Sequence, residues 1–309
     1  MKIVKSITNV YNKISNYGKI LLFISILLIL IMFFKNIFVK KREGFIQNEK
    51  FVFKENNDIY DDFYSNIYDY LVFSNVKNDY EIGAIVNKTL PDNTSIIVDI
   101  GCGTGHHVAA LSQNGLNVLG IDISPSMIKT AKEKYPNYKF EVGNALDSSL
   151  LNYNSVTHIL CLYFTIYFFP NKEQFFNNCM NWLMPGGYLV IHLVDRDKFD
   201  PILPPGNPLY IVSPQKYAKE RITHTKITFN EFQYESNFNL DSENDIAVFQ
   251  EKFKFNDGNT RKQEQKLYME NISTIVDYAQ NAGFIIHAKI DLLKCAYENQ
   301  FLYIFIKPS

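Results

Sequence analysis

The sequence predicts an α/β fold in which a mostly parallel sheet is covered by helices on both faces. Residues 96–98 form a short apolar run typical of a buried parallel strand, and a glycine-rich turn follows it. An apolar-periodic helix begins at His106, and a second apolar strand ends at Asp122, about 20 residues after the turn. This order of elements indicates a site for an adenosine cofactor, because the carboxylate can accept hydrogen bonds from both ribose hydroxyls.

The spacing of the glycines distinguishes between two kinds of cofactor. The dinucleotide pattern G-x-G-x-x-G would need its third glycine at position 106, which is His106, so a nicotinamide is disfavoured. The chain instead has Gly101, Gly103 and Gly105 after Asp99, which resembles the first motif of the class I S-adenosylmethionine-dependent methyltransferases, of the type 11/25 methyltransferase-domain family. The resemblance implies a Rossmann-like, doubly wound sheet of seven mostly parallel strands, with S-adenosylmethionine as the cofactor.

Further motifs of this family follow in the same order along the chain. Ser124 and Pro125 form a helix start, with serine as the N-cap and proline at the first helical position. Met127 falls in the first turn, where the family places an apolar side chain against the adenine; the alternative is a methionine of the core. Asn144 stands where many members carry Asp, and its oxygen can still accept a bond from the adenine amino group. Residues 182–191 resemble the L-x-P-G-G turn into the fifth strand.

The resemblance assigns the cofactor contacts to residues at the ends of successive strands. The fourth strand is expected at residues 158–163, with the loop 164–169 at its active end. The implied cofactor-binding residues are Asp99, Gly101, Cys102, Gly103, Gly105, Asp122, Ile123, Met127, Asn144, Ala145 and Tyr163. No metal is expected.

The N-terminal part of the chain contains an apolar run, residues 20–34, flanked by Lys19 and Lys35. Counted to Val39 past a snorkelling Lys35, it reaches roughly the 20 residues of a membrane-spanning helix. A cleaved signal peptide would need small residues after the run, and a buried core helix would need an amphipathic stripe. We therefore predict an uncleaved transmembrane anchor.

The anchor prediction sets the domain boundaries and the localisation. We expect a basic segment at 1–19, the anchor at 20–39, a linker at 40–57 and a methyltransferase domain at 58–309, with a substrate-capping insertion at about 196–269. Basic residues on both sides of the anchor leave the charge rule indecisive. Because S-adenosylmethionine is a cytosolic metabolite, we expect a single-pass membrane protein with its catalytic domain in the cytoplasm.

The charge distribution disfavours a nucleic-acid partner. Residues 1–50 carry nine Lys and Arg against two Glu, which leaves a net charge of −8 on the rest of a chain whose total is −1. An acidic domain binds phosphate backbones poorly, so RNA or DNA methylation is not expected. The four cysteines have no paired spacing, which suits a reducing compartment.

Two regions bear on the methyl acceptor. Tyr64 and Tyr68 share a face of an aromatic helix expected at residues 60–71, and the resemblance implies that a tyrosine there covers the cofactor; the alternative is an aromatic core stripe. His192, near the active end of the fifth strand, is a candidate general base or else an orienting residue. We take His192 and Tyr64 as the candidate catalytic residues.

The insertion after the fifth strand is expected to be an antiparallel flap. A proline-rich loop at 200–208 precedes extended segments at 225–238, 246–255 and 261–269, with a bulge in the first and a hairpin turn at 256–259. Such a flap would cap the acceptor pocket, or simply cover the sheet.

These observations favour a membrane-anchored methyltransferase that acts on the nitrogen or oxygen of a small-molecule or lipid-like acceptor. The alternatives are a protein methyltransferase at a membrane and a catalytically silent cofactor-binding scaffold. The complete donor motif disfavours the scaffold.

Overall fold

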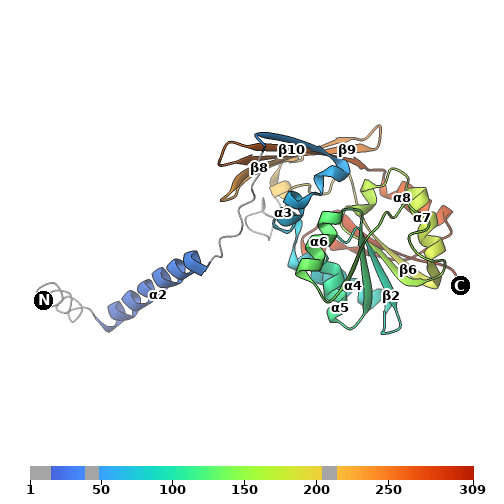
Figure 1. Ribbon diagram of the computed structural model, residues 1–309, viewed down its shortest axis with the longest axis horizontal. Helices are drawn as coiled ribbons and strands as arrows, with labels where there is room; N and C mark the ends of the chain where they lie inside the picture. Colours follow the sequence, from blue (N-terminus) through green and yellow to red (C-terminus); the bar gives the residue numbers. More distant parts are fainter. Residues whose placement is uncertain (1–14, 39–48, 204–213) are drawn as a thin grey trace, which may run out of the picture. The chain divides into compact units, whose positions relative to one another are not determined.

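The computed structural model describes residues 15–38, 49–203 and 214–309 (Figure 1). The chain divides into two compact units, Met1–Ile46 and Gln47–Ser309, and each is described by itself. Most of the predicted basic segment, the first part of the predicted linker and the end of the proline-rich loop lie outside the described residues.

The first unit contains one described helix, α2 (Asn16–Phe38). The prediction of a transmembrane anchor at 20–39 is wrong, and with it the single-pass membrane localisation: in the described part of the chain, no helix combines the length and apolarity needed to cross a membrane. Lys19 and Lys35 bound the apolar run of α2 to residues 20–34, which is shorter than the roughly 20 residues that a span requires.

The second unit is built on a seven-stranded sheet of order β11-β12-β6-β5-β2-β3-β4. Strands β2 to β6 run parallel, and β12 pairs antiparallel with β6 and β11. The chain runs outward from β2 to β4 and then returns to the other side of β2, so the crevice for a ligand opens at the carboxyl ends beside β2. The strands are β2 (Ile96–Ile100), β3 (Asn117–Asp122), β4 (Lys139–Val142), β5 (Val156–Cys161), β6 (Leu183–Val194), β11 (Ile285–Asp291) and β12 (Gln300–Ile306). This mostly parallel sheet confirms the Rossmann-like part of the predicted fold.

Helices bury apolar side chains on both faces of this sheet. Phe175 and Ile275, from α7 and α8, belong to the core on one face, while Ile85 and Leu111, from α4 and α5, belong to the core on the other. The strands are therefore covered on both sides, as expected for near-continuous apolar runs. The helices are α3 (Asp62–Val72), α4 (Asn75–Thr89), α5 (His106–Gln113), α6 (Pro125–Lys134), α7 (Lys172–Trp182) and α8 (Ile272–Asn281).

Local sequence signals account for several helix boundaries. The Ser124 hydroxyl accepts a hydrogen bond from the Met127 amide at 3.1 Å, which is the predicted N-cap of α6. Gly283 follows α8 with a φ of 103°, a left-handed conformation that glycine adopts at helix ends. Helix α7 was not predicted, although Asn171 caps it by accepting from the Gln174 amide at 3.0 Å.

A second sheet, of order β1-β10-β9-β8-β7, lies at the top of Figure 1 above α3. Its strands are β1 (Phe51–Glu55), β7 (His224–Thr228), β8 (Phe232–Asp241), β9 (Ile246–Phe255) and β10 (Thr260–Tyr268). The predicted bulge in 225–238 is wrong: the shift in apolar phase marks a chain reversal, in which the Phe229 amide donates to the Phe232 carbonyl at 2.9 Å. Strand β1, which pairs parallel with β10, was not predicted.

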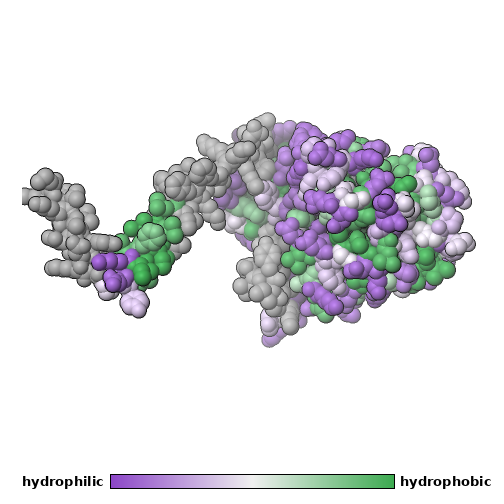
Figure 2. All heavy atoms as spheres, turned by 90° about the horizontal axis from the view of Figure 1, so that it is seen from below, coloured by the Kyte–Doolittle hydropathy of each residue, from purple (hydrophilic) through white to green (hydrophobic). Residues whose placement is uncertain are grey.

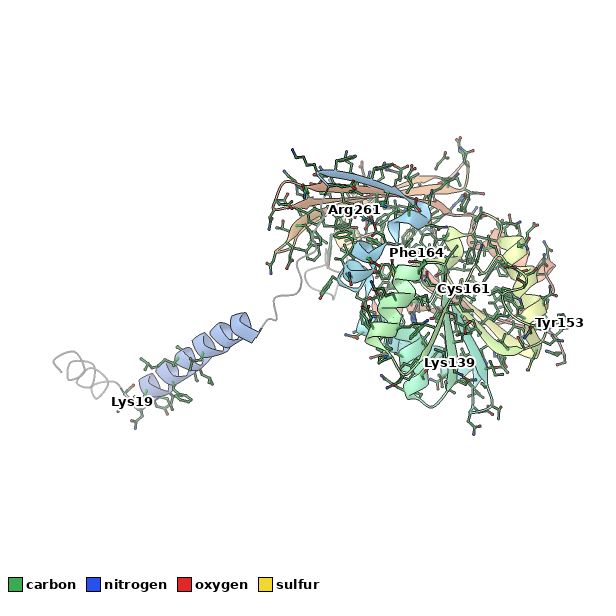
Figure 3. The ribbon with its side chains drawn as sticks, in the orientation of Figure 1. Lys19, Lys139, Tyr153, Cys161, Phe164 and Arg261 are labelled. Carbon is green, nitrogen blue, oxygen red and sulfur yellow. The ribbon has the colours of Figure 1, made fainter. Side chains whose placement is uncertain are left out.

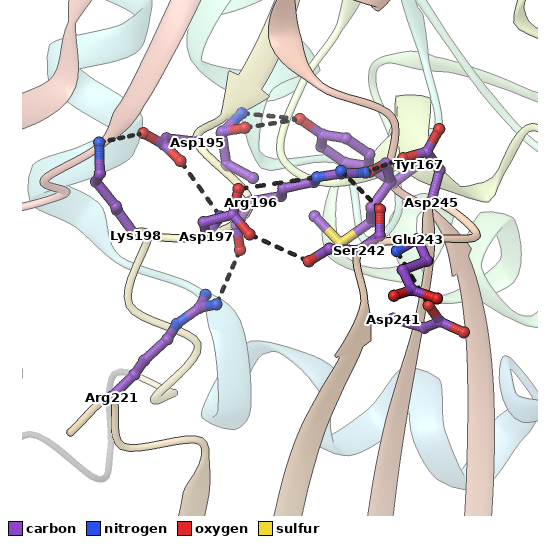
Figure 4. A network of polar contacts seen from close by, with 12 residues as sticks. Tyr167, Asp195, Arg196, Asp197, Lys198, Arg221, Asp241, Ser242, Glu243 and Asp245 are labelled. Atoms are coloured by element: carbon purple, nitrogen blue, oxygen red, sulfur yellow. Dashed lines mark hydrogen bonds and ion pairs between the residues drawn. The ribbon is translucent and has the colours of Figure 1, made fainter.

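The buried Arg196 and the partly buried Arg221 tie the second sheet to the end of β6 (Figure 4). Arg196 donates to the Asp245 carboxylate, to the Met269 carbonyl at 2.6 Å and to the Ser242 carbonyl at 3.1 Å. Arg221 in turn donates to the Arg196 carbonyl at 2.9 Å. Because these bonds join the loop after β6 to the β8–β9 turn, they hold the insertion over the edge where the strands end. The face of this unit seen in Figure 2 mixes hydrophilic and hydrophobic side chains.

Candidate active site

The glycine turn after β2 adopts a backbone that other residues would strain. Gly101 and Gly105 have φ values of 70° and 88°, in the left-handed region. A Cβ at Gly101 would clash with the Thr165 side chain, and one at Gly105 would lie 2.7 Å from the Phe140 ring. The turn therefore brings bare backbone to the carboxyl edge of the sheet.

Asp122, at the end of β3, is fixed beside this turn. One carboxylate oxygen accepts from the Gly103 amide at 3.0 Å, and the other accepts from the Ser124 amide at 2.9 Å. Burial raises the pKa of Asp122, and these amides act in the opposite direction. The carboxylate borders a cavity that we call the Asp122 cavity. Its other lining residues include Gly101, Gly103, Ile123, Met127, Gly143, Asn144, Ala145, Thr165 and Phe168.

Asp99 lies on the other side of the turn, next to a second cavity, here called the glycine-loop cavity. This space is lined by Asp99, Gly101, Cys102, Gly103, Lys77, Glu81, His107, Tyr68 and Tyr163, among others. Asp99 is 1% exposed, and its Oδ2 has no hydrogen-bond partner. Burial raises the pKa of Asp99 to about 7. An unpaired buried carboxylate oxygen is costly, so it marks a place where a ligand can donate.

A buried charged pair from α4 faces Asp99 across the glycine-loop cavity. Lys77 Nζ lies 2.5 Å from Glu81 Oε1, and His107 Nε2 donates to Glu81 Oε2 at 3.2 Å. Burial alone would raise the pKa of Glu81, but Lys77 and His107 outweigh it and hold the pKa at about 2. Both charge signs are thus available beside the glycine turn.

A third cavity, which we call the roofed cavity, lies beneath the second sheet. Phe164 lies below this sheet, on the side of the central sheet, whereas Arg261 belongs to the sheet itself (Figure 3). Tyr68 borders all three cavities, and Tyr163 borders both the roofed and the glycine-loop cavities. The three spaces therefore converge on the tyrosines between the glycine turn and the second sheet.

The two candidate catalytic residues have different surroundings. Tyr64 lines the roofed cavity, and its hydroxyl donates to Glu251 at 2.9 Å; burial raises its pKa well above the usual value, so it remains a neutral donor. His192 is fully buried and is not among the residues that line these three cavities. Its Nδ1 contacts the Tyr163 carbonyl and its Nε2 lies 3.0 Å from Gln300 Oε1, while burial lowers its pKa to about 4.

His192 contacts the backbone of a cavity residue and lines none of the three cavities itself. Tyr163 has a φ of 53°, which is strained for a residue with a side chain, and His192 holds its carbonyl. Cys102 borders the glycine-loop cavity but also packs in the core between α5 and the sheet.

Sequence reasoning missed Glu251, Gln265 and Gln300, which are polar residues of the roofed cavity. Glu251 alternates with Phe249 and Phe253 on β9, so it shares their inward face. A charged residue at an inward-facing position between two phenylalanines of one strand was the sequence signal that could have identified Glu251.

Comparison with known proteins agrees with this geometry. A family model described as "Methyltransferase domain" matches residues 98–191, which contain the glycine turn, Asp122 and most of β6. Among curated proteins, the chain is 33% identical over 128 residues to the putative methyltransferase 235L of Invertebrate iridescent virus 6, covering 40% of this chain and 43% of that protein. The match thus spans less than half of that relative.

Solved structures share the fold at low sequence identity. The CcbJ methyltransferase from Streptomyces caelestis aligns with a TM-score of 0.60 and 14% identity, over 82% of this chain and all of that one. CalS10 of Micromonospora echinaspora, an amino pentose methyltransferase solved with S-adenosylmethionine bound, aligns with a TM-score of 0.53 and 16% identity, over 75% of this chain and 90% of its own.

The resemblance read from the motifs is thereby confirmed, because family model and fold agree. Residues 98–191 match a methyltransferase domain, and the structure has the fold of class I S-adenosylmethionine-dependent methyltransferases.

Proposed function

We propose that the chain transfers a methyl group from S-adenosylmethionine to a small molecule bound in the roofed cavity. The observation that carries the proposal is the convergence of three cavities on Tyr68. Two of these cavities border the glycine turn and would hold the two ends of the cofactor. The third, the roofed cavity, would hold the acceptor.

The residues of the first two cavities fit the chemistry of the cofactor. Asp122 offers a carboxylate to the ribose hydroxyls, and the unpaired Oδ2 of Asp99 offers an acceptor to the ammonium group. Lys77 borders the same cavity and can neutralise the cofactor carboxylate. Ile123, Met127, Asn144 and Ala145 line the Asp122 cavity, where they would surround the adenine.

The chain's own contribution to the reaction is alignment and exclusion of water. When bound, S-adenosylmethionine supplies an electrophilic methyl group, which an acceptor nitrogen or oxygen takes up by in-line displacement. Tyr68 and Tyr163 border the junction of the cavities, where their rings can stabilise a cation. His192 would act by holding the Tyr163 carbonyl. The second sheet roofs the acceptor, which supports the proposed capping role of residues 196–269 within a domain at 58–309.

A small-molecule acceptor is better supported than a protein or a silent scaffold. Both carboxylates of the donor site border these cavities together with Gly101 and Gly103, and Gly105 has the positive φ that the turn needs. The donor site is therefore complete, as turnover requires. The acceptor cavity is lined on one side by β8, β9 and β10 and on the other by α3, so it suits a compact molecule.

The test uses the full chain with S-adenosylmethionine labelled in its methyl group and fractionated small-molecule extracts. We expect label to appear in a low-molecular-weight product, and Asp122→Ala to abolish this transfer. Label in protein alone, or binding of the cofactor without transfer to any fraction, would contradict the proposal.

A further inference from the structure

The walls of the roofed cavity are aromatic and carry negative charge. Half of its lining residues are Phe or Tyr, and its charged groups are the carboxylates of Glu251 and Asp200. Among the described residues that line it there is no Lys, Arg or His. The cavity thus presents acceptors of hydrogen bonds and π faces, both of which attract cations.

Glu251 is a buried carboxylate held by neutral donors. It is 4% exposed and accepts from the Tyr64 hydroxyl at 2.9 Å, the Tyr234 hydroxyl at 2.6 Å and the Gln263 amide at 2.6 Å. A carboxylate offers about four acceptor positions, so three donors leave room for another.

The nearby guanidinium of Arg261 does not neutralise Glu251 by contact. It donates to Gln263 Oε1 at 2.8 Å, to the Asp61 carboxylate at 2.8 Å and to the Ile59 carbonyl at 2.9 Å. Burying a charge without an opposite partner is expensive. A ligand that brings a positive charge would therefore gain more from Glu251 than a neutral one.

A second acceptor faces the same cavity from the next strand. Gln265 is 7% exposed, and its Oε1 has no hydrogen-bond partner, while its Nε2 donates to the Lys266 carbonyl at 2.9 Å. Gln263 and Gln265 alternate on β10 and so share its inward face. Two independent groups, the Glu251 carboxylate and the unpaired Gln265 Oε1, can thus accept hydrogen bonds from N–H or O–H groups of a ligand.

We propose that the methyl acceptor is an amine on an apolar or aromatic framework, which Glu251 binds through its nitrogen and Gln265 through a further N–H or O–H. This inference rests on the proposed function, since it names the class of acceptor for the same site. In the transfer, the bound ammonium first releases a proton to solvent. The freed nitrogen lone pair then forms the new C–N bond, the C–S pair returns to sulfur, and the methylated product is again an ammonium. An anionic acceptor is disfavoured because it would lie beside Glu251 and Asp200.

The experiment compares matched ligands on the full chain saturated with S-adenosylhomocysteine. The probes are phenethylamine, 3-phenylpropylamine and 4-phenylbutylamine, each against its alcohol and its carboxylate of equal length, titrated by calorimetry. We expect at least one amine to bind tenfold or more tightly than its alcohol, with the carboxylate weakest. If no amine binds more tightly than its alcohol, the inference is overturned.

A variant pair then assigns the preference to Glu251. Glu251→Gln keeps the side-chain shape and is expected to erase the difference between amine and alcohol. Glu264→Gln, on the neighbouring strand, removes a carboxylate that bonds Gln250 at 2.9 Å outside the cavity and is expected to keep the difference. A preference that survives in Glu251→Gln contradicts the assignment.

Failure of this inference is distinguishable from failure of the proposed function. If S-adenosylhomocysteine binds, and alcohols are methylated by S-adenosylmethionine in preference to amines, only the amine inference fails. A chain that binds no S-adenosylhomocysteine removes the methyltransferase proposal itself.

Discussion

The protonation of Asp99 should control the affinity for the cofactor. In the free protein, burial holds the pKa of Asp99 at about 7, so its carboxyl group carries a proton at lower pH. The ammonium group of the cofactor favours the carboxylate, and below pH 7 binding must therefore expel this proton. Affinity is expected to rise with pH up to about 7 and then to level off.

The size of the effect follows from the pKa. At a pH about 1.5 units below it, only about one Asp99 in 30 is ionised, so affinity falls about 30-fold, or about 2 kcal/mol at roughly 1.4 kcal/mol per unit. The assay is calorimetric titration of S-adenosylhomocysteine, which has the same ammonium group, at pH 5.5 and pH 8.

The variant Asp99→Asn distinguishes the protonation of Asp99 from that of its neighbours His107, Glu81 and Asp122, which remain in place. The variant should bind weakly at both pH values and lose most of the difference between them. Equal affinity of the unchanged protein at the two pH values would refute the reasoning, and so would a full pH dependence that persists in Asp99→Asn.

Three further predictions concern the glycine turn, Asp69 on α3 and His192. Gly101→Ala should lower stability and cofactor affinity more than Gly186→Ala, measured by thermal melts and titration, because both sites have positive φ but only the first meets a side chain, that of Thr165; equal effects would contradict this. Burial would raise the pKa of Asp69, but His106 and Lys134 outweigh burial and hold this pKa at about 2. The ionised Asp69 therefore adds about 2 kcal/mol to the free energy of unfolding above about pH 4, and this contribution is lost as the pH falls toward 2. Between pH 7 and pH 2.5, urea unfolding should show a smaller loss of stability for Asp69→Asn than for the unchanged protein. An equal loss in both proteins would contradict this prediction. His192→Asn should slow transfer without removing a limb of the pH–rate profile; loss of a limb would restore His192 as the base.

Local patterns predicted the glycine turn and the start of the helix after β3, since their signals lie close together in sequence. Gly101, Gly103 and Gly105 encode a turn through their own backbone freedom, and the Ser124 hydroxyl caps the helix that it begins. The glycine turn and this helix start lie near each other because they follow β2 and β3, which are neighbouring parallel strands.

Long-range pairing accounts for what the sequence did not reveal. Strand β1 is paired with β10, which lies far along the chain, so no local pattern marks it. His192 was rightly placed near the end of β6, but its bonds to Tyr163 and Gln300 depend on two other strand ends. The anchor prediction failed because it counted apolar residues beyond Lys35 toward a span.

The most direct test of the account is a crystal structure of the full chain with S-adenosylhomocysteine. The account predicts ribose hydroxyls on the Asp122 carboxylate, the ammonium group on Asp99 Oδ2 and the sulfur beside Tyr68. Ligand density away from the glycine turn, or a turn closed by side chains at saturating ligand, would contradict it.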